Sequence, residues 1–166
     1  MTALRSARVR RTMLVKRAVA ATMFAAALIG GTSPVLAEKR FFTIAAVEPK
    51  GSATTDKEPF PEAALPDGGG YVLRKPDAGS RWEVSTYIWM PSQIVVDQGD
   101  EVTLEFIGIN GSSHPTTIRG IDKTIVVKRG TVTQVRFVAD KAGVFQIECA
   151  THRPSMTAEI IVNARR

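Results

Sequence analysis

The sequence centres on one short segment, Cys149-Ala150-Thr151-His152-Arg153-Pro154-Ser155-Met156. A thiol, an imidazole and a thioether lie within this segment, and a second imidazole, that of His114, lies 35 positions before Cys149. Cys149 is the only cysteine of the chain, and His114 and His152 are its only histidines. Two imidazoles and a thiolate, with a weak axial thioether, are the ligands of mononuclear electron-transfer copper sites. We therefore predict that His114, Cys149, His152 and Met156 bind one copper ion.

Each of these residues alone has a simpler interpretation. A single cysteine can be a small apolar residue of the core, a lone histidine is more often a surface residue than a ligand, and a methionine is more often core. The combination and the spacing favour a metal site instead. Cys149 ends a predicted strand and His152 lies in the adjoining loop, so one turn can present both side chains. His114 must then come from a different loop at the same end of the domain.

The first 37 residues have the layout of an export signal. A basic region precedes the apolar run 18–29, and Val35-Leu36-Ala37 offers a cleavage site after Ala37. The apolar run is too short to span a bilayer. We predict that residues 1–37 are a signal peptide and that the mature chain is periplasmic. Arg10-Arg11 also resembles a twin-arginine signal, so the general secretory route and the twin-arginine route both stay open.

The formal net charge of +6 belongs to this leader. Six of the 22 Lys and Arg lie in residues 1–37, which contain no acidic residue, so residues 38–166 carry 16 basic and 16 acidic side chains. A neutral mature chain does not predict nucleic-acid binding, and it predicts weak long-range steering of partners. With one cysteine it cannot form an internal disulfide. We expect no membrane span in the mature chain.

Two regions follow the predicted leader. Residues 38–81 are rich in proline, glycine and charged residues, which predicts an extended arm or linker with little regular structure beyond a short strand at 41–47. Residues 82–166 contain short apolar and β-branched runs between turn signals, and Val102, Leu104 and Phe106 alternate with polar residues. This pattern predicts an all-β domain, a sandwich or barrel. Strands are expected at 83–89, 94–96, 102–106, 117–118, 124–127, 131–138, 144–149 and 158–162.

Residues 142–152, Ala-Gly-Val-Phe-Gln-Ile-Glu-Cys-Ala-Thr-His, resemble the Gly-x-aromatic-x-x-x-Cys-x-x-His segment of the cupredoxins. These are the blue type 1 copper proteins, which include plastocyanin, pseudoazurin and amicyanin. Residues 95–102 and 110–114 are similar to the first strands and first-ligand loop of that family, and the resemblance covers roughly residues 82–164. It implies a cupredoxin-like Greek-key β-sandwich in which His114, Cys149 and His152 bind copper and Met156 is the axial ligand.

Two departures from the family pattern stand out. The spacing between His152 and Met156 lies between the shorter and the longer ligand loops of the family, which puts the axial role of Met156 in question. Many members also carry Asn directly after the first histidine, where it ties the two ligand loops together. Pro115 stands at that position here, so the residues around the thiolate must tune it differently.

The favoured function is a monomeric, exported electron carrier rather than an enzyme. Its expected partners are periplasmic redox proteins such as a c-type cytochrome or an oxidoreductase, docking near His152, Pro115 and Pro154 as family members usually do. Two alternatives stay open: a periplasmic copper chaperone or buffer, and a small copper catalyst that resembles nitrosocyanin. Met-rich or His-rich tracts would favour the first, and this chain has none. The second would need a carboxylate ligand, for which Glu148 and Glu159 are near in sequence.

Overall fold

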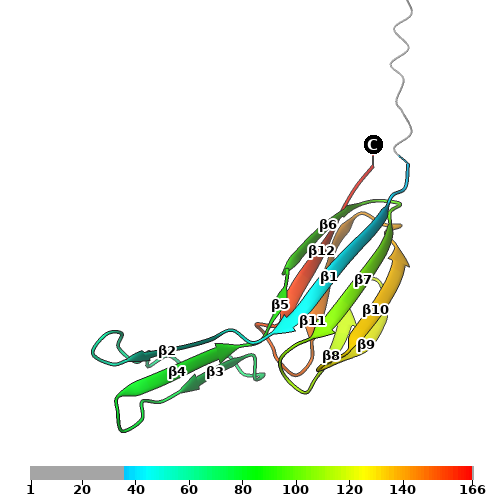
Figure 1. Ribbon diagram of the computed structural model, residues 1–166. Coiled ribbons are helices and arrows are strands. Elements are labelled where there is room, and N and C mark those ends of the chain that lie inside the picture. The colour runs from blue at the N-terminus through cyan, green and yellow to red at the C-terminus, as the bar shows by residue number, and fades with distance from the viewer. Residues whose placement is uncertain (1–35, 166) are drawn as a thin grey trace, which may run out of the picture. The chain divides into compact units, whose positions relative to one another are not determined.

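The computed structural model describes residues 36–165. Residues 1–35 and Arg166 lie outside the described part, so the predicted signal peptide is outside it apart from its last two residues. The described chain contains twelve strands in three sheets (Figure 1). They are β1 (Lys39–Val47), β2 (Lys50–Thr54), β3 (Tyr71–Arg74), β4 (Arg81–Thr86), β5 (Ile88–Met90), β6 (Gln93–Asp97), β7 (Glu101–Gly108), β8 (Ser113–Ile118), β9 (Lys123–Lys128), β10 (Val132–Val138), β11 (Gly143–Cys149) and β12 (Thr157–Asn163). Among these residues no helix is long and apolar enough to cross a membrane.

Two of the sheets share one hydrophobic core and form a sandwich. One has the strand order β10-β7-β1-β5 and the other the order β6-β12-β11-β8-β9. Each contains one parallel pair, β1 with β7 and β12 with β6, among antiparallel pairs. The core contains residues of both sheets, for example Ile44, Leu104 and Phe106 from the first and Ile118, Ile147 and Ile160 from the second. This confirms the prediction of an all-β sandwich.

The predicted alternation decides which side chains enter this core. Val102, Leu104 and Phe106 of β7 are buried, while the residues between them are only partly covered. Burying one such side chain stabilises the fold by about 1.5–3 kcal/mol. On β11 the same period buries Ile147 and Cys149. The thiol therefore lies at the end of a core strand, inside the packed interior.

The prediction for residues 38–81 needs correction. They were expected to form an arm with little regular structure, but β1, β2 and β3 lie there. β1 is an inner strand of the first sheet, paired in parallel with β7 from Lys39↔Glu101 to Ala46↔Gly108 and antiparallel with β5. The short strand expected at 41–47 is present as part of β1. The sandwich therefore begins at this strand and not at residue 82. The partner strand β7 is about 60 residues away in sequence, so local composition could not reveal the pairing.

The third sheet, β2-β4-β3, contains the other two strands of this region, while residues 55–70 between them form no named strand. Its middle strand β4 was expected to continue into 88–89 as one strand of the sandwich. Instead the chain leaves β4 at Thr86, and β5 pairs with β1. Trp82 of β4 fixes the connection between β2 and β3 to this sheet: its ring is buried and packs edge-on against Phe60 at 6.1 Å, and its Nε1–H donates to the carbonyl oxygen of Glu58 at 2.9 Å.

A buried carboxylate ties β1 to the turn between β6 and β7. Asp100 is fully buried and accepts hydrogen bonds from the backbone N–H groups of Glu38 and Asp97, both at 3.0 Å, and from Nε of Arg40 at 3.1 Å. Arg165 also pairs with it. Burial opposes ionisation, but these donors outweigh it and hold the pKa of Asp100 below its usual value.

Candidate metal centre

Three of the four predicted ligands meet at one end of the sandwich. His114 lies on β8, Cys149 ends β11, and His152 lies in the turn that follows β11. Nδ1 of His114 lies 3.2 Å from Nδ1 of His152, and Cys149 Sγ lies 3.9 Å and 3.5 Å from these two nitrogens. His114 and Cys149 are buried, and His152 is partly exposed. The donor atoms therefore converge without an intervening side chain.

The triangle of donor atoms fits a metal ion. A triangle with these three sides has a circumscribed radius of about 2.1 Å, so one point in its plane is about 2.1 Å from each donor. Metal–imidazole bonds to a comparable ion, zinc, measure about 2.0–2.1 Å and metal–thiolate bonds about 2.3 Å. Two imidazoles and one thiolate around a near-planar position are the equatorial set of a mononuclear copper site. The group could bind one copper ion with little rearrangement.

The orientation of His114 is fixed by the loop before β8. Its Nε2–H faces the carbonyl oxygen of Asn110 at 2.8 Å, which leaves Nδ1 to point at the other donors. Gly111 makes this close turn possible because its φ is +71°, and an added Cβ would lie 2.7 Å from Cε1 of His114. Asn110 also accepts a hydrogen bond from the Glu48 N–H, which fixes the loop to the end of β1.

Electrostatics within the triad favour the thiolate. Burial by itself raises the pKa of Cys149, but the contacts with His114 and Thr151 outweigh it and lower that pKa. Burial likewise opposes protonation of His114, yet the contacts with Cys149 and Asn110 raise its pKa. Burial and the neighbouring His114 charge lower the pKa of His152. The charged sulfur that a copper ion requires is therefore stabilised by the folded chain itself.

The fourth predicted ligand, Met156, is joined to the same loop through its backbone. Its N–H donates to the carbonyl oxygen of His152 at 2.9 Å, and its own carbonyl accepts from the Cys149 N–H at 3.1 Å. The side chain is fully buried and belongs to the core together with Cys149. The loop thus closes into a tight turn that returns Met156 to the core, with its backbone bonded to that of Cys149. Axial ligation by the Met156 sulfur stays a prediction.

The two loops that carry the candidate ligands are joined by a backbone hydrogen bond, although residue 115 is a proline and not an asparagine. The Ala150 N–H donates to the carbonyl oxygen of Pro115 at 2.8 Å, and Cys149 pairs with Thr116 across β11 and β8. A backbone bond thus links the loops at the position where many cupredoxins use an asparagine. Proline has no N–H, so it cannot itself donate to the thiolate.

Aromatic rings cover two of the ligands, and the sequence did not single them out. Tyr87 stacks on His152 with ring centroids 4.0 Å apart and an interplanar angle of 29°. The buried Trp89 packs edge-on against His114 at 5.8 Å. Tyr87 precedes β5 and Trp89 lies within it. The sequence predicted one continuous strand over 83–89, which did not reveal the contacts of these two rings with the histidines. The two rings restrict the motion of both imidazoles.

The ligand loop is also held by the glycine segment Gly68–Gly70, which lies in the region predicted to be an arm or linker with little regular structure. Gly68 accepts a hydrogen bond from the Arg153 N–H at 3.1 Å, and the Gly70 N–H donates to the Arg153 carbonyl at 3.0 Å. An added Cβ on Gly68 or Gly70 would lie 2.8 Å or 2.6 Å from that carbonyl oxygen. Only glycine permits this approach. The three consecutive glycines were the signal in the sequence for a close approach of two backbone segments.

Glu148 does not join the donor group. Its carboxylate pairs with Arg119 at 2.6 Å and with Arg153 at 2.9 Å, in agreement with strand alternation, which turns it away from Cys149. Glu159 pairs instead with Gln93. The nearby carboxylates that a catalytic site could recruit are thus engaged elsewhere.

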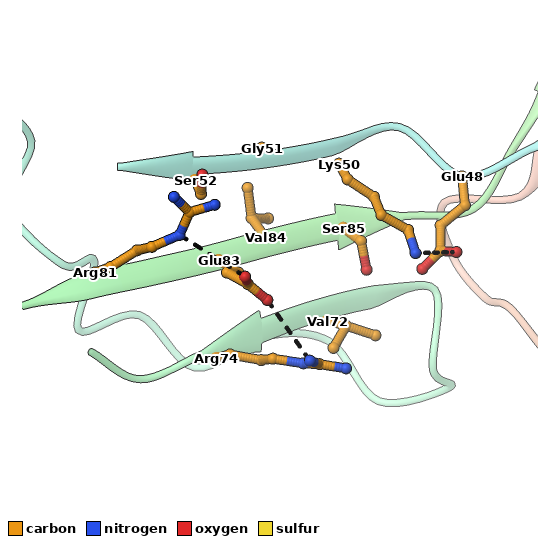
Figure 2. A pocket seen from close by; sticks show the side chains of 10 residues that line it. All are labelled: Glu48, Lys50, Gly51, Ser52, Val72, Arg74, Arg81, Glu83, Val84 and Ser85. Carbon is orange, nitrogen blue, oxygen red and sulfur yellow. Dashed lines mark ion pairs between the residues drawn. The ribbon is translucent and has the colours of Figure 1, made fainter. Parts of the chain in front are cut away.

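A separate hollow of about 350 Å³ lies on the β2-β4-β3 sheet (Figure 2). Its charged residues pair with one another: Glu83 with Arg74 at 3.6 Å and with Arg81 at 3.9 Å, and Glu48 with Lys50 at 3.2 Å. The charges largely cancel. This exposed sheet face does not resemble the converging donors of the metal centre.

Comparisons with known proteins place the fold. No family model and no curated protein sequence matches the chain. Among solved structures, a copper nitrite reductase from Nitrosomonas europaea is similar with a TM-score of 0.51 and 18% identity, covering 77% of this chain and 42% of that one. A multicopper oxidase from Pseudomonas thermotolerans is similar with a TM-score of 0.50 and 14% identity, covering 79% and 31%. The chain thus spans less than half the length of either enzyme.

A smaller structure shows a weaker likeness. Auracyanin A, a "blue" copper protein from Chloroflexus aurantiacus, matches 46% of this chain and 89% of its own length, with 16% identity and a TM-score of 0.39. The two stronger likenesses concern the fold alone, and the donor group is a property of this chain's own residues. The chain has a cupredoxin-like fold, with a His114–Cys149–His152 group that could bind one copper ion.

Proposed function

We propose that the chain is an exported type 1 copper protein that carries single electrons between periplasmic redox partners. The observation that supports this most is the convergence of His114, Cys149 and His152 on a point about 2.1 Å from all three donor atoms. A copper ion bound there would supply a one-electron couple between Cu(II) and Cu(I). The chain's own residues hold the donors in place for both oxidation states.

Rigidity is the property that electron transfer requires of this site, because little should move when the charge of the metal changes. The His114 imidazole is held by Asn110 and packed by Trp89, and the His152 imidazole is stacked by Tyr87. The ligand loop is further held at Arg153. These contacts fix the side chains that carry the donor atoms, so the geometry of the candidate site is pre-organised.

The same burial argues against copper delivery as the main role. A chaperone passes its ion by ligand exchange, which requires that a partner's donors reach the metal. Cys149 and His114 are fully buried, so a partner could approach only from the side of His152. An electron needs no such opening, and the partly exposed His152 offers a short route to the surface. We propose a c-type cytochrome or a periplasmic oxidoreductase as partner, docking around His152, Pro115 and Pro154.

The test is the visible absorption spectrum of the chain without residues 1–37, loaded with Cu(II), beside a Cys149→Ser variant. We expect an intense blue band in the first protein and its loss in the second, because the band is charge transfer from the thiolate to copper. Colourless protein that binds only Cu(I) would refute the carrier and favour copper handling. A green or red protein, whose strong absorption lies at shorter wavelength than that of a blue one, would favour a site with altered axial ligation and the catalytic alternative.

A further inference from the structure

The Cys149 thiolate has a hydrogen-bond donor that none of the predicted ligands supplies. Oγ1 of Thr151 lies 3.4 Å from Cys149 Sγ, within the range of a hydrogen bond to sulfur. The other side-chain contacts of this sulfur are the Nδ1 atoms of His114 and His152. Thr151 is two residues after the thiol, in the turn that the loop makes before His152. Its hydroxyl is therefore placed at the sulfur by the backbone of the ligand loop itself.

The hydroxyl has two acceptors in the metal-free chain. It lies 3.3 Å from Nδ1 of His152 as well as 3.4 Å from the sulfur. In a copper-loaded site both Nδ1 lone pairs are metal ligands, so neither can accept a hydrogen bond. Of these two protein acceptors, the thiolate is then the one that remains for Thr151. The contact would thus be retained, and favoured, in the state that transfers electrons.

Such a bond changes the balance between the two oxidation states. The thiolate gives more electron density to Cu(II) than to Cu(I), so it carries more negative charge when the copper is reduced. Hydrogen bonds to charged acceptors are stronger than those to neutral ones. A donor at the sulfur therefore stabilises the reduced site more than the oxidised site and raises the reduction potential. Pro115 cannot provide this donor because it lacks an N–H.

We propose that Thr151 is a positioning residue whose hydroxyl donates to the Cys149 thiolate and raises the reduction potential of the copper site. This inference rests on the proposed function, since it requires that copper is bound. It assigns a role to a solvent-exposed side chain that would otherwise be interpreted as an ordinary loop residue.

The experiment compares the midpoint potential and visible spectrum of the copper-loaded chain with those of Thr151→Val and Thr151→Ser. Valine keeps the shape of threonine and removes the hydroxyl, whereas serine keeps the hydroxyl. We expect Thr151→Val to shift the Cu(II)/Cu(I) equilibrium toward Cu(II) by up to about tenfold, which is about 59 mV for one electron. The thiolate charge-transfer band should move to longer wavelength, because the sulfur orbital rises in energy. Thr151→Ser should restore most of both properties.

Thr124→Val, the same chemical change on the exposed side of β9, is the matched control. It should leave the midpoint potential and the charge-transfer band unchanged. A blue Thr151→Val protein with the control's potential and band would overturn the inference. Equal shifts in Thr151→Val and Thr151→Ser would also overturn it, because serine keeps the hydroxyl and the loss of that hydroxyl could then not be the cause of the shift. An absence of blue colour in the unaltered protein would instead overturn the proposed function, and this inference with it.

Discussion

Gly111→Ala is the substitution with the most direct consequence for the metal centre. Gly111 has a φ of +71°, and a methyl group there would lie 2.7 Å from Cε1 and 2.9 Å from Nε2 of His114. Ordinary contacts begin at 3.4 Å. His114 is fully buried, and its Nε2 already faces the Asn110 carbonyl. The methyl group must therefore displace either the ring or the loop that orients it.

The magnitude follows from these distances. The shortfall against an ordinary contact is about 0.7 Å, whereas metal–ligand distances tolerate a deviation of only about 0.2 Å. Disturbing the groups that orient a ligand typically lowers metal affinity by about 10–100-fold. We expect a loss of that size in the copper affinity of Gly111→Ala, together with a changed visible spectrum. An alanine at positive φ also costs about 1–2 kcal/mol of unfolding free energy, whatever its neighbours.

Gly130→Ala separates these two effects. Gly130 has a φ of +73°, and nothing lies within 4 Å of its added Cβ. Urea unfolding of the metal-free proteins should show a similar backbone penalty in both variants. Copper affinity, measured by competition with a chelator, should fall only in Gly111→Ala. If both variants bind copper as tightly as the unaltered chain, the contact between residue 111 and His114 does not govern the site, and the reasoning is refuted.

Two further substitutions test other parts of the structure. Gly70→Ala should accelerate copper release several-fold, because a Cβ would lie 2.6 Å from the Arg153 carbonyl oxygen. Gly51→Ala, whose added Cβ meets only Val84 at 3.4 Å, is the control. Equal release rates for the two variants in stopped-flow chelation would contradict this prediction. Asp100→Asn should lower the unfolding free energy at pH 7 by about 3 kcal/mol in urea titrations, because it removes a buried paired charge. The folded-state pKa of Asp100 is lowered from 3.8, so its contribution is present above that value and is lost as the pH falls through the folded-state pKa. The stability difference between the two proteins should therefore shrink in that acidic range, and a difference independent of pH would count against the assignment.

Much of the sandwich could be predicted because its signals are local. The alternation of Val102, Leu104 and Phe106 on β7, and of Ile147 and Cys149 on β11, follows from the period of two that any half-buried strand must have. The register is then fixed, since a shift by one residue would turn every buried side chain outward. The loop from Cys149 to Met156 could be recognised for the same reason: the candidate ligands Cys149, His152 and Met156 are close in sequence.

The region before residue 82 could not be predicted in the same way. β1 is stabilised by β7 and β5, which lie far along the chain, and it carries the exposed Phe41 and charged residues that weaken its apolar pattern. The run Gly68–Gly70 has the composition of a loose loop. Its function as a contact to Arg153 depends on where the third sheet brings it, which no local pattern encodes.

The sequence alone determined the donor types, the strand pattern and the pairing of Cys149 with His152 in one turn, because these depend on residue identity and short spacing. Only the tertiary structure decided that Nδ1 of His114 lies 3.2 Å from Nδ1 of His152 and that Tyr87 stacks on the His152 ring. It also decided that the Thr151 hydroxyl lies at hydrogen-bond distance from Cys149 Sγ. The physical reason is that such contacts join segments or orient side chains through packing. Packing energy belongs to the whole core and not to any one stretch of the chain.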